Sequence, residues 1–149
     1  LIELLGRVDL LLVNDEEARQ LSGEGTLIGA SRWIQERGPR MVVVKKGEHG
    51  AILFSDDSMF FVPAFPLRQV FDPTGAGDAF AGGLLGYISR QNSTSVADLR
   101  RAMAFGSILG SFAIENFSIE SLRTLTTSKI LARVRKLKVM TTFDMNERG

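Results

Sequence analysis

The chain has no cysteine and a single histidine among its 149 residues. The absence of cysteine excludes disulfide scaffolds and cysteine-ligated zinc sites, and it fits a reducing compartment, so we expect a cytoplasmic protein. One histidine argues against histidine-rich metal sites and against a Ser-His-Asp triad. That residue, His49, lies in an expected turn, where we expect it to be exposed rather than catalytic.

The chain also has almost no excess of positive over negative charge, and it has no long apolar run. The formal net charge is +1, which gives no general attraction to nucleic acid or to an anionic membrane. No apolar run approaches the roughly 20 residues that span a bilayer. With 44% hydrophobic and 23% charged residues, the composition is that of a soluble globular domain with one core. We therefore expect neither a nucleic-acid nor a membrane partner.

Short apolar runs alternate with amphipathic segments along the chain. The runs DLLLV and MVVV are continuous, which indicates strands buried on both faces. Turn residues between the later runs predict a small antiparallel meander. Strands are expected at 9–13, 41–44, 51–54 and 59–62, and helices at 15–22, 26–37, 79–90, 96–115, 119–125 and 128–138. This alternation predicts an α/β layered domain.

A glycine cluster, DPTGAGDAFAGG at residues 72–83, precedes one of these helices. The backbone N–H groups of residues 75–78 fall where the helix should begin. First-turn N–H groups have no partner inside a helix, and the helix dipole there favours negative charge. Glycines let an anion approach such backbone closely. The cluster therefore indicates an anion site suited to phosphate.

Asp78 is unexpected in such a site, because a carboxylate repels a phosphate. It is explained if the site needs a base that takes a proton from an attacking hydroxyl, next to donors that stabilise a transferring phosphoryl group. The alternative is a glycine-rich turn in which Asp78 is only an acid favoured at a helix start.

The same residues resemble the signature D-T-x-G-A-G-D-x-F-x-x-G of the ribokinase-like (PfkB) carbohydrate kinases. Every specified position matches except Pro73, which stands where threonine is usual and would remove a hydroxyl contact. The resemblance implies that Asp78 is the catalytic base. It also implies that Gly75, Ala76 and Gly77 form the anion hole.

Asn14-Asp15-Glu16-Glu17 resembles the N-x-x-E motif of that family. The resemblance implies that Asn14 and Glu17 lie near Mg²⁺ and the phosphates, and amide and carboxylate oxygens are hard ligands suited to this ion. The alternative is a capping box, with Asn14 as N-cap and Glu17 three residues later. The two roles are compatible.

Lys45-Lys46-Gly47-Glu48-His49-Gly50 resembles the family segment T-L-G-x-x-G on the nucleotide side. Gly47 and Gly50 match this pattern, whereas Lys45 stands where threonine is usual. The resemblance implies ATP contacts from these three positions, and from Thr74 in the glycine cluster. An ammonium at position 45 could contact phosphates as a point charge. Equally, both lysines could be solvated charges at a strand end.

A stripe of small residues recurs every four positions in the long helix expected at 96–115: Ala102, Gly106 and Gly110. It permits close approach of another helix, the sheet or an adenine. The resemblance implies an adenine wall here, with Gly106 and Ser107 as candidates. It extends to SFAIENFS at 111–118. The basic residues around 130–138 are expected on a surface helix, without a nucleic-acid role.

The resemblance implies a three-layer α/β/α ribokinase-like fold with a mostly parallel sheet and a small antiparallel meander. Residues 1–149 would be its C-terminal, nucleotide-binding and catalytic part. The N-terminal half and its lid, through which a homodimer could form, are not found, so we expect a partial sequence.

Three functions follow from these patterns. The first is a kinase that moves the γ-phosphate of MgATP to a hydroxyl of a sugar or nucleoside. The second is a module that binds ATP or ADP without catalysis, because it lacks the substrate lid. The third is a structural α/β domain with no ligand.

Overall fold

The computed structural model describes residues 2–56, 58–115 and 120–144. Their elements follow one another along the chain as α1 (Ile2–Leu5), β1 (Leu10–Asn14), α2 (Asp15–Ser22), α3 (Leu27–Gln35), β2 (Met41–Lys45), η1 (Gly47–His49), β3 (Ala51–Ser55), β4 (Ser58–Val62), α4 (Ala76–Gln91), α5 (Val96–Ile114), α6 (Glu120–Arg123) and α7 (Thr127–Thr141). Part of the helix expected at 119–125 and of the SFAIENFS segment lies outside the described residues.

The four strands form one mixed sheet in the order β1-β2-β3-β4. Strands β1 and β2 are parallel, whereas β2-β3 and β3-β4 are antiparallel pairs. The α/β class and the meander are thus confirmed. Parallel pairing does not predominate among the described strands, because the turns after β2 and β3 are too short for the crossover that parallel neighbours require.

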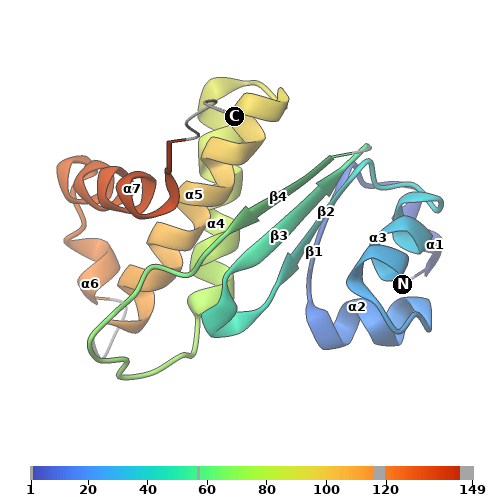
Figure 1. Ribbon diagram of the computed structural model, residues 1–149, viewed down its shortest axis with the longest axis horizontal. Coiled ribbons are helices and arrows are strands. Elements are labelled where there is room, and N and C mark those ends of the chain that lie inside the picture. Colours follow the sequence, from blue (N-terminus) through green and yellow to red (C-terminus); the bar gives the residue numbers. More distant parts are fainter. Residues whose placement is uncertain (1, 57, 116–119, 145–149) are drawn as a thin grey trace.

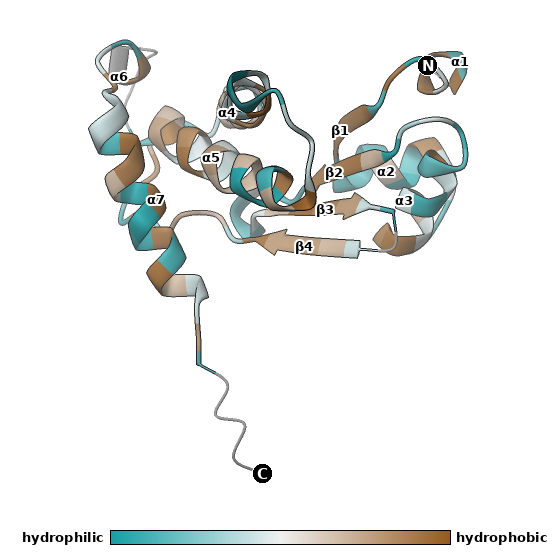
Figure 2. Ribbon diagram, turned by 90° about the horizontal axis from the view of Figure 1, so that it is seen from above, coloured by the Kyte–Doolittle hydropathy of each residue, from teal (hydrophilic) through white to brown (hydrophobic). Residues whose placement is uncertain are grey.

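Helices cover both faces of the sheet, so the predicted three layers are present (Figure 1). On one face, the side chains of Val42 and Val44 pack with Ala30 and Ile34 of the α2-α3 layer. On the other, Val43 packs in a second core with α4, α5 and α7. Alternate residues of β2 therefore enter different cores, which explains its unbroken apolar sequence. Figure 2 shows the strands as predominantly apolar between helices of mixed hydropathy.

Helix starts follow the side chains that can cap them. Four described helices begin behind a capping side chain, from Asn14 (α2), Thr26 (α3), Ser95 (α5) and Thr126 (α7). Each oxygen accepts a hydrogen bond from a first-turn N–H group, a contact usually worth about 1 kcal/mol. Helix α4 begins at Ala76, three residues before the predicted start, and has no side-chain cap.

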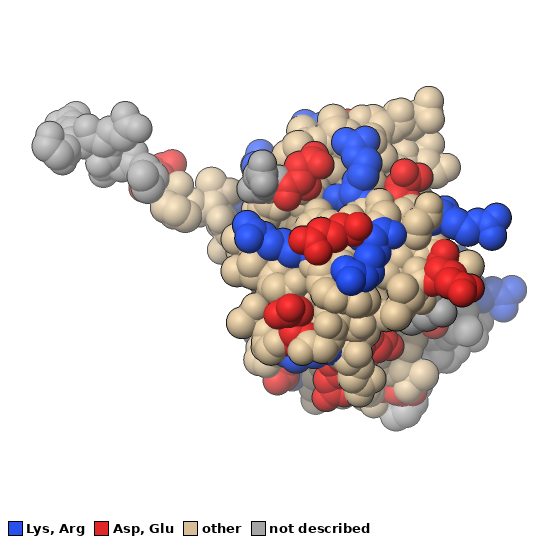
Figure 3. Space-filling model, turned by 90° about the vertical axis from the view of Figure 1, so that its right-hand side faces the viewer, with Lys and Arg blue, Asp and Glu red and all other residues tan. Residues whose placement is uncertain are grey.

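The distribution of surface charge and the lengths of the apolar helices are as the composition predicts. Lys and Arg side chains lie interspersed with Asp and Glu on the face formed by α1–α3 (Figure 3). Among the described residues, no helix combines the length and apolar character needed to cross a bilayer.

Candidate active site

A cavity of about 120 Å³ lies where β2, the η1 turn, α4 and α5 meet. Its lining contains six of the residues that the sequence assigned to a nucleotide site: Lys45, Gly47, Gly50, Ala76, Gly77 and Ser107. These residues come from three separate stretches of the chain. The carboxyl end of a parallel strand is where open α/β sheets place their ligands, and Lys45 is the last residue of β2.

The turn after β2 owes its shape to Gly50. This residue has φ = 86°, and a Cβ there would lie 2.1 Å from the Val62 carbonyl oxygen and 2.7 Å from Cα of Pro63. No other residue type fits this position without displacing backbone. The close approach fixes the η1 turn against the chain leaving β4. His49, within the turn, is exposed as predicted.

The first turn of α4 forms part of the cavity wall. Gly75 adopts the left-handed conformation (φ = 81°), and the next two residues, Ala76 and Gly77, line the cavity. The Ala76 N–H donates to the Pro73 carbonyl at 3.3 Å, a long bond that an anion could replace. Because no side chain caps this helix, its positive end remains available to a ligand.

Lys45 places a second positive group at the same point. Its Nζ lies 2.8 Å from where a Cβ of Gly77 would be, so the ammonium rests on the bare backbone of α4. Within the described part of the chain, no carboxylate lies within 4.0 Å of this ammonium. Two positive groups converge here, an arrangement that an anion between them would stabilise. Lys46, by contrast, does not line the cavity.

Asp78 is the third residue of α4 and is exposed. It does not line the cavity, although Gly77 before it and Phe80 after it do. An exposed carboxylate next to this cavity can meet a molecule that approaches from solvent. The geometry is compatible with a base, and it is also compatible with an acid that only stabilises the helix start.

The stretch before α4 is held by Asp72. Its Oδ1 accepts the Thr74 N–H at 2.8 Å. The Thr74 hydroxyl first, and its backbone N–H second, hold the pKa of the Asp72 carboxyl below its ordinary value. Thr74 itself lies outside the cavity lining, as does Gly75. Both residues shape the approach to the anion site.

Replacing Thr74 by Val should raise the pKa of Asp72 toward its ordinary value, because the hydroxyl bond is lost and the backbone bond stays. Since the folded pKa is the lower one, this turn is stabilised above the unfolded pKa, and that contribution disappears as pH falls through the folded value. NMR titration of the carboxyl carbons checks this. Asp98, whose pKa is lowered by Ser93 and Ser95, is the internal control. An unmoved Asp72 titration contradicts the assignment.

Asn14 and Glu17 form the predicted capping box. The Glu17 N–H donates to Asn14 Oδ1 at 2.7 Å, and the Asn14 N–H donates to Glu17 Oε2 at 2.8 Å. In the parallel β1-β2 pair, Asn14 lies opposite Lys45, so the box stands at the same sheet edge as the cavity. The capping role is therefore real, and a further role toward a metal remains a prediction.

Comparison with models of known protein families assigns this chain to a family. Residues 1–124 match the family described as "pfkB family carbohydrate kinase". This chain belongs to the pfkB family. The fold and the family expected from the sequence are thus confirmed.

Individual relatives within the pfkB family are sugar and nucleoside kinases. The cytidine kinase of Thermococcus kodakarensis is 38% identical over 90 residues, which cover 59% of this chain and 32% of the relative. The aminoimidazole riboside kinase of Salmonella typhimurium is 36% identical over 102 residues, covering 68% of this chain and 32% of the relative. The chain spans about a third of each relative's length.

Solved structures give the same result. The crystal structure of aminoimidazole riboside kinase from Salmonella enterica, complexed with aminoimidazole riboside and an ATP analog, has a TM-score of 0.75 and 28% identity, and the match covers 87% of this chain and 43% of that one. Fructokinase from Vibrio cholerae, bound to fructose, ADP and calcium, has a TM-score of 0.76 and 25% identity, with 87% and 42% covered.

The small-residue stripe of this pfkB-family chain packs against a helix. A Cβ on Gly106 would lie 3.0 Å from the Phe80 carbonyl oxygen, and one on Gly110 would lie 3.2 Å from that of Ala76. Gly106 thus faces α4. It is not among the residues that line the cavity, whereas Ser107 and Gly110 are. One residue along a helix turns the side chain by about 100°, which separates Ser107 from Gly106.

Sequence reasoning missed part of the cavity wall. The missed residues are Ala64, Phe65, Phe80, Ser111 and Ile114, together with Gly110, which was noted only as part of the stripe. Phe65 comes from a segment without regular structure, whose place depends on tertiary contacts. The signal that could have found Ser111 and Ile114 is helical spacing, since they follow Ser107 at four and seven residues.

Proposed function

We propose that this chain is the nucleotide-binding and catalytic part of an ATP-dependent sugar or nucleoside kinase. The observation that carries the proposal is the convergence of the Lys45 ammonium and the uncapped first turn of α4 on one cavity. Membership of the pfkB family and the sugar and nucleoside kinases among its relatives support the reaction class.

The cavity joins a positively charged end to apolar side chains, a combination that suits part of a nucleotide. Lys45, Ala76 and Gly77 would receive phosphate oxygens at one end. Apolar side chains, among them Phe65 and Ile114, also line the cavity and could contact a base or ribose. ATP is the ligand we propose for this combination, in line with the ATP analog and ADP bound by its structural neighbours.

Asp78 would act as the general base. Its carboxylate accepts the proton of the acceptor hydroxyl, whose oxygen forms a bond to the γ-phosphorus while the bond to the bridging oxygen of the β-phosphate breaks. ADP leaves with that bridging oxygen. The N–H groups of Gly75, Ala76 and Gly77, with Lys45, would stabilise the negative charge on the transferred group.

Mg²⁺ fits this site only with help from the nucleotide. The described residues contain no group of three or more metal-ligating side chains, and the capping box occupies Oδ1 of Asn14 and Oε2 of Glu17. Oε1 of Glu17 is the oxygen that could hold a hydrated cation, which is how Mg²⁺ usually binds beside phosphates. When bound, the ion would neutralise charge on the phosphates.

The test is a kinase assay of the full-length protein against a panel of sugars and nucleosides, with MgATP as donor. We expect ADP formation that depends on one acceptor, and calorimetric binding of ADP. ADP binding without acceptor-dependent turnover would support a binding module instead. Absence of both would leave a structural domain and would overturn the proposal.

A further inference from the structure

Arg133 on α7 holds the outer wall of the cavity without lining it. Its side chain is only 15% exposed. One guanidinium reaches two residues of α5, the residue that follows this helix, and one residue of the segment between β4 and α4. Its partners are Ser111, Phe112, Glu115 and Phe65.

The guanidinium of Arg133 donates hydrogen bonds from its edge and contacts aromatic rings with its face. Nη1 donates to Ser111 Oγ at 3.0 Å, and Nη2 donates to Glu115 Oε2 at 2.6 Å. The Cζ atom lies 3.6 Å from the ring centroid of Phe112 and 5.0 Å from that of Phe65. A planar fork that both donates and stacks is specific to arginine, because a lysine ammonium is a point charge.

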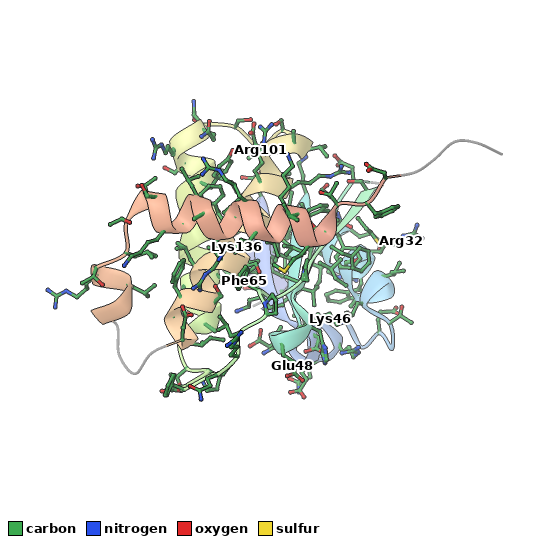
Figure 4. All side chains as sticks on the ribbon, turned by 60° about the vertical axis from the view of Figure 1, so that its left-hand side comes forward. Arg32, Lys46, Glu48, Phe65, Arg101 and Lys136 are labelled. Carbon is green, nitrogen blue, oxygen red and sulfur yellow. The ribbon has the colours of Figure 1, made fainter. Side chains whose placement is uncertain are left out.

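Two of these partners, Ser111 and Phe65, line the proposed nucleotide cavity. Phe65 and Arg133 also line a larger open groove, of about 1000 Å³, between α7 and the segment 65–71, with Phe112 of α5 in its wall. Phe65 thus separates the cavity from this groove, with Arg133 behind it. In Figure 4, Phe65 lies beside α7, on the same side as Lys136.

The segment that carries Phe65 needs such support because it has no regular structure. Two hydrogen bonds also tie this segment to α5: the Ser107 hydroxyl donates to the Pro63 carbonyl at 2.7 Å, and the Phe71 N–H donates to the Ile114 carbonyl at 3.0 Å. Arg133 contacts Phe65, which lies between Pro63 and Phe71 in the sequence. Without it, Phe65 would lose its stacking partner, and the cavity would open toward the groove.

We propose that Arg133 is a positioning residue that sets nucleotide affinity by holding Phe65 and Ser111 in the cavity wall. This inference rests on the proposed function. None of the partners of Arg133 described above belongs to α4, which carries Asp78 and the anion hole. Losing Arg133 should therefore weaken nucleotide binding far more than it slows the chemical step.

The experiment compares Arg133→Met, Arg133→Lys and the control Lys136→Met in the full-length protein, with ADP as the calorimetric probe. Lys136 lies one turn further along α7, is exposed and lines the same groove. We expect Arg133→Met to raise the Kd for ADP and the KM for ATP about tenfold, on the scale of a lost stacked and hydrogen-bonded cation. The value of kcat should change less than about twofold. Arg133→Lys should fall between wild type and Arg133→Met, and Lys136→Met should match wild type.

The outcomes separate this inference from the function on which it rests. If the wild type binds no ADP, both fail. If it binds ADP and Arg133→Lys binds it equally well, the positioning role alone is wrong, even where Arg133→Met does not fold. A fall in kcat at unchanged KM, or an equal loss from Lys136→Met, also overturns it.

Discussion

Replacing Asp78 by Asn should lower kcat at least about 10²-fold, the usual magnitude for loss of a general base. The amide keeps the shape of the carboxylate and cannot accept the proton of the acceptor hydroxyl. ADP should bind as well as before or more tightly, because a negative charge has been removed from beside an anion site. Steady-state kinetics on the full-length protein and calorimetry with ADP measure the two effects separately.

The matched control is Asp56→Asn. Asp56 lies in the turn between β3 and β4 with a left-handed backbone (φ = 45°), a conformation that Asn also tolerates, and it is exposed. Its only described ion pair, with Arg40, is at the 4.0 Å limit, so its loss should leave kcat unchanged. Unaltered turnover in Asp78→Asn would remove Asp78 from the chemistry and leave it as a helix-start acid.

The largest expected loss of stability comes from Gly50→Ala. The new Cβ would lie 2.1 Å from the Val62 carbonyl oxygen, and the residue would keep a positive φ. The clash and the positive φ both belong to the backbone, so no side-chain rotation can relieve them. We therefore expect a loss of roughly 3 kcal/mol or more in the free energy of unfolding. Thermal and urea unfolding of the full-length protein measure it. ADP affinity should fall with it, because the η1 turn lines the cavity.

Gly25→Ala is the control, because it replaces a glycine by alanine without a clash or a positive φ. Gly25 has no positive φ, and a Cβ there would meet nothing within 4 Å. Its replacement should change stability by about 0.5 kcal/mol or less, as is usual for surface positions. Equal stability of Gly50→Ala and wild type would show that the η1 turn can move away from β4, against the geometry described here.

The sequence predicted those parts of the fold that depend on local chemistry. Apolar runs located all four described strands, and the capping residue Asn14 located the start of α2. The start of α4 was placed three residues late, because glycines normally weaken helices. Here Gly77 is helical all the same, since its missing side chain makes room for Lys45.

The sequence predicted the parts of the candidate site that depend on glycine-containing turns. It did not predict the parts whose position depends on how helices and loops pack together. The glycine cluster and the turn after β2 supplied residues that do line the cavity. The orientation of α5 decided between Gly106 and Ser107, and spacing alone did not reveal it. Phe65 and Arg133 were missed because their proximity depends on how α7 packs on α5, a contact between segments far apart in sequence.

The missing cap of α4 has a thermodynamic consequence. Four other described helices are capped by a side chain of the protein, whereas α4 would be capped by the phosphate of its ligand. Each turnover would then remove and restore about the energy of one cap, roughly 1 kcal/mol. The order of the first turn would be linked to nucleotide occupancy, so its amide hydrogens should exchange faster in the nucleotide-free enzyme than in the complex with ADP. The reactant would thereby serve as a temporary part of the secondary structure.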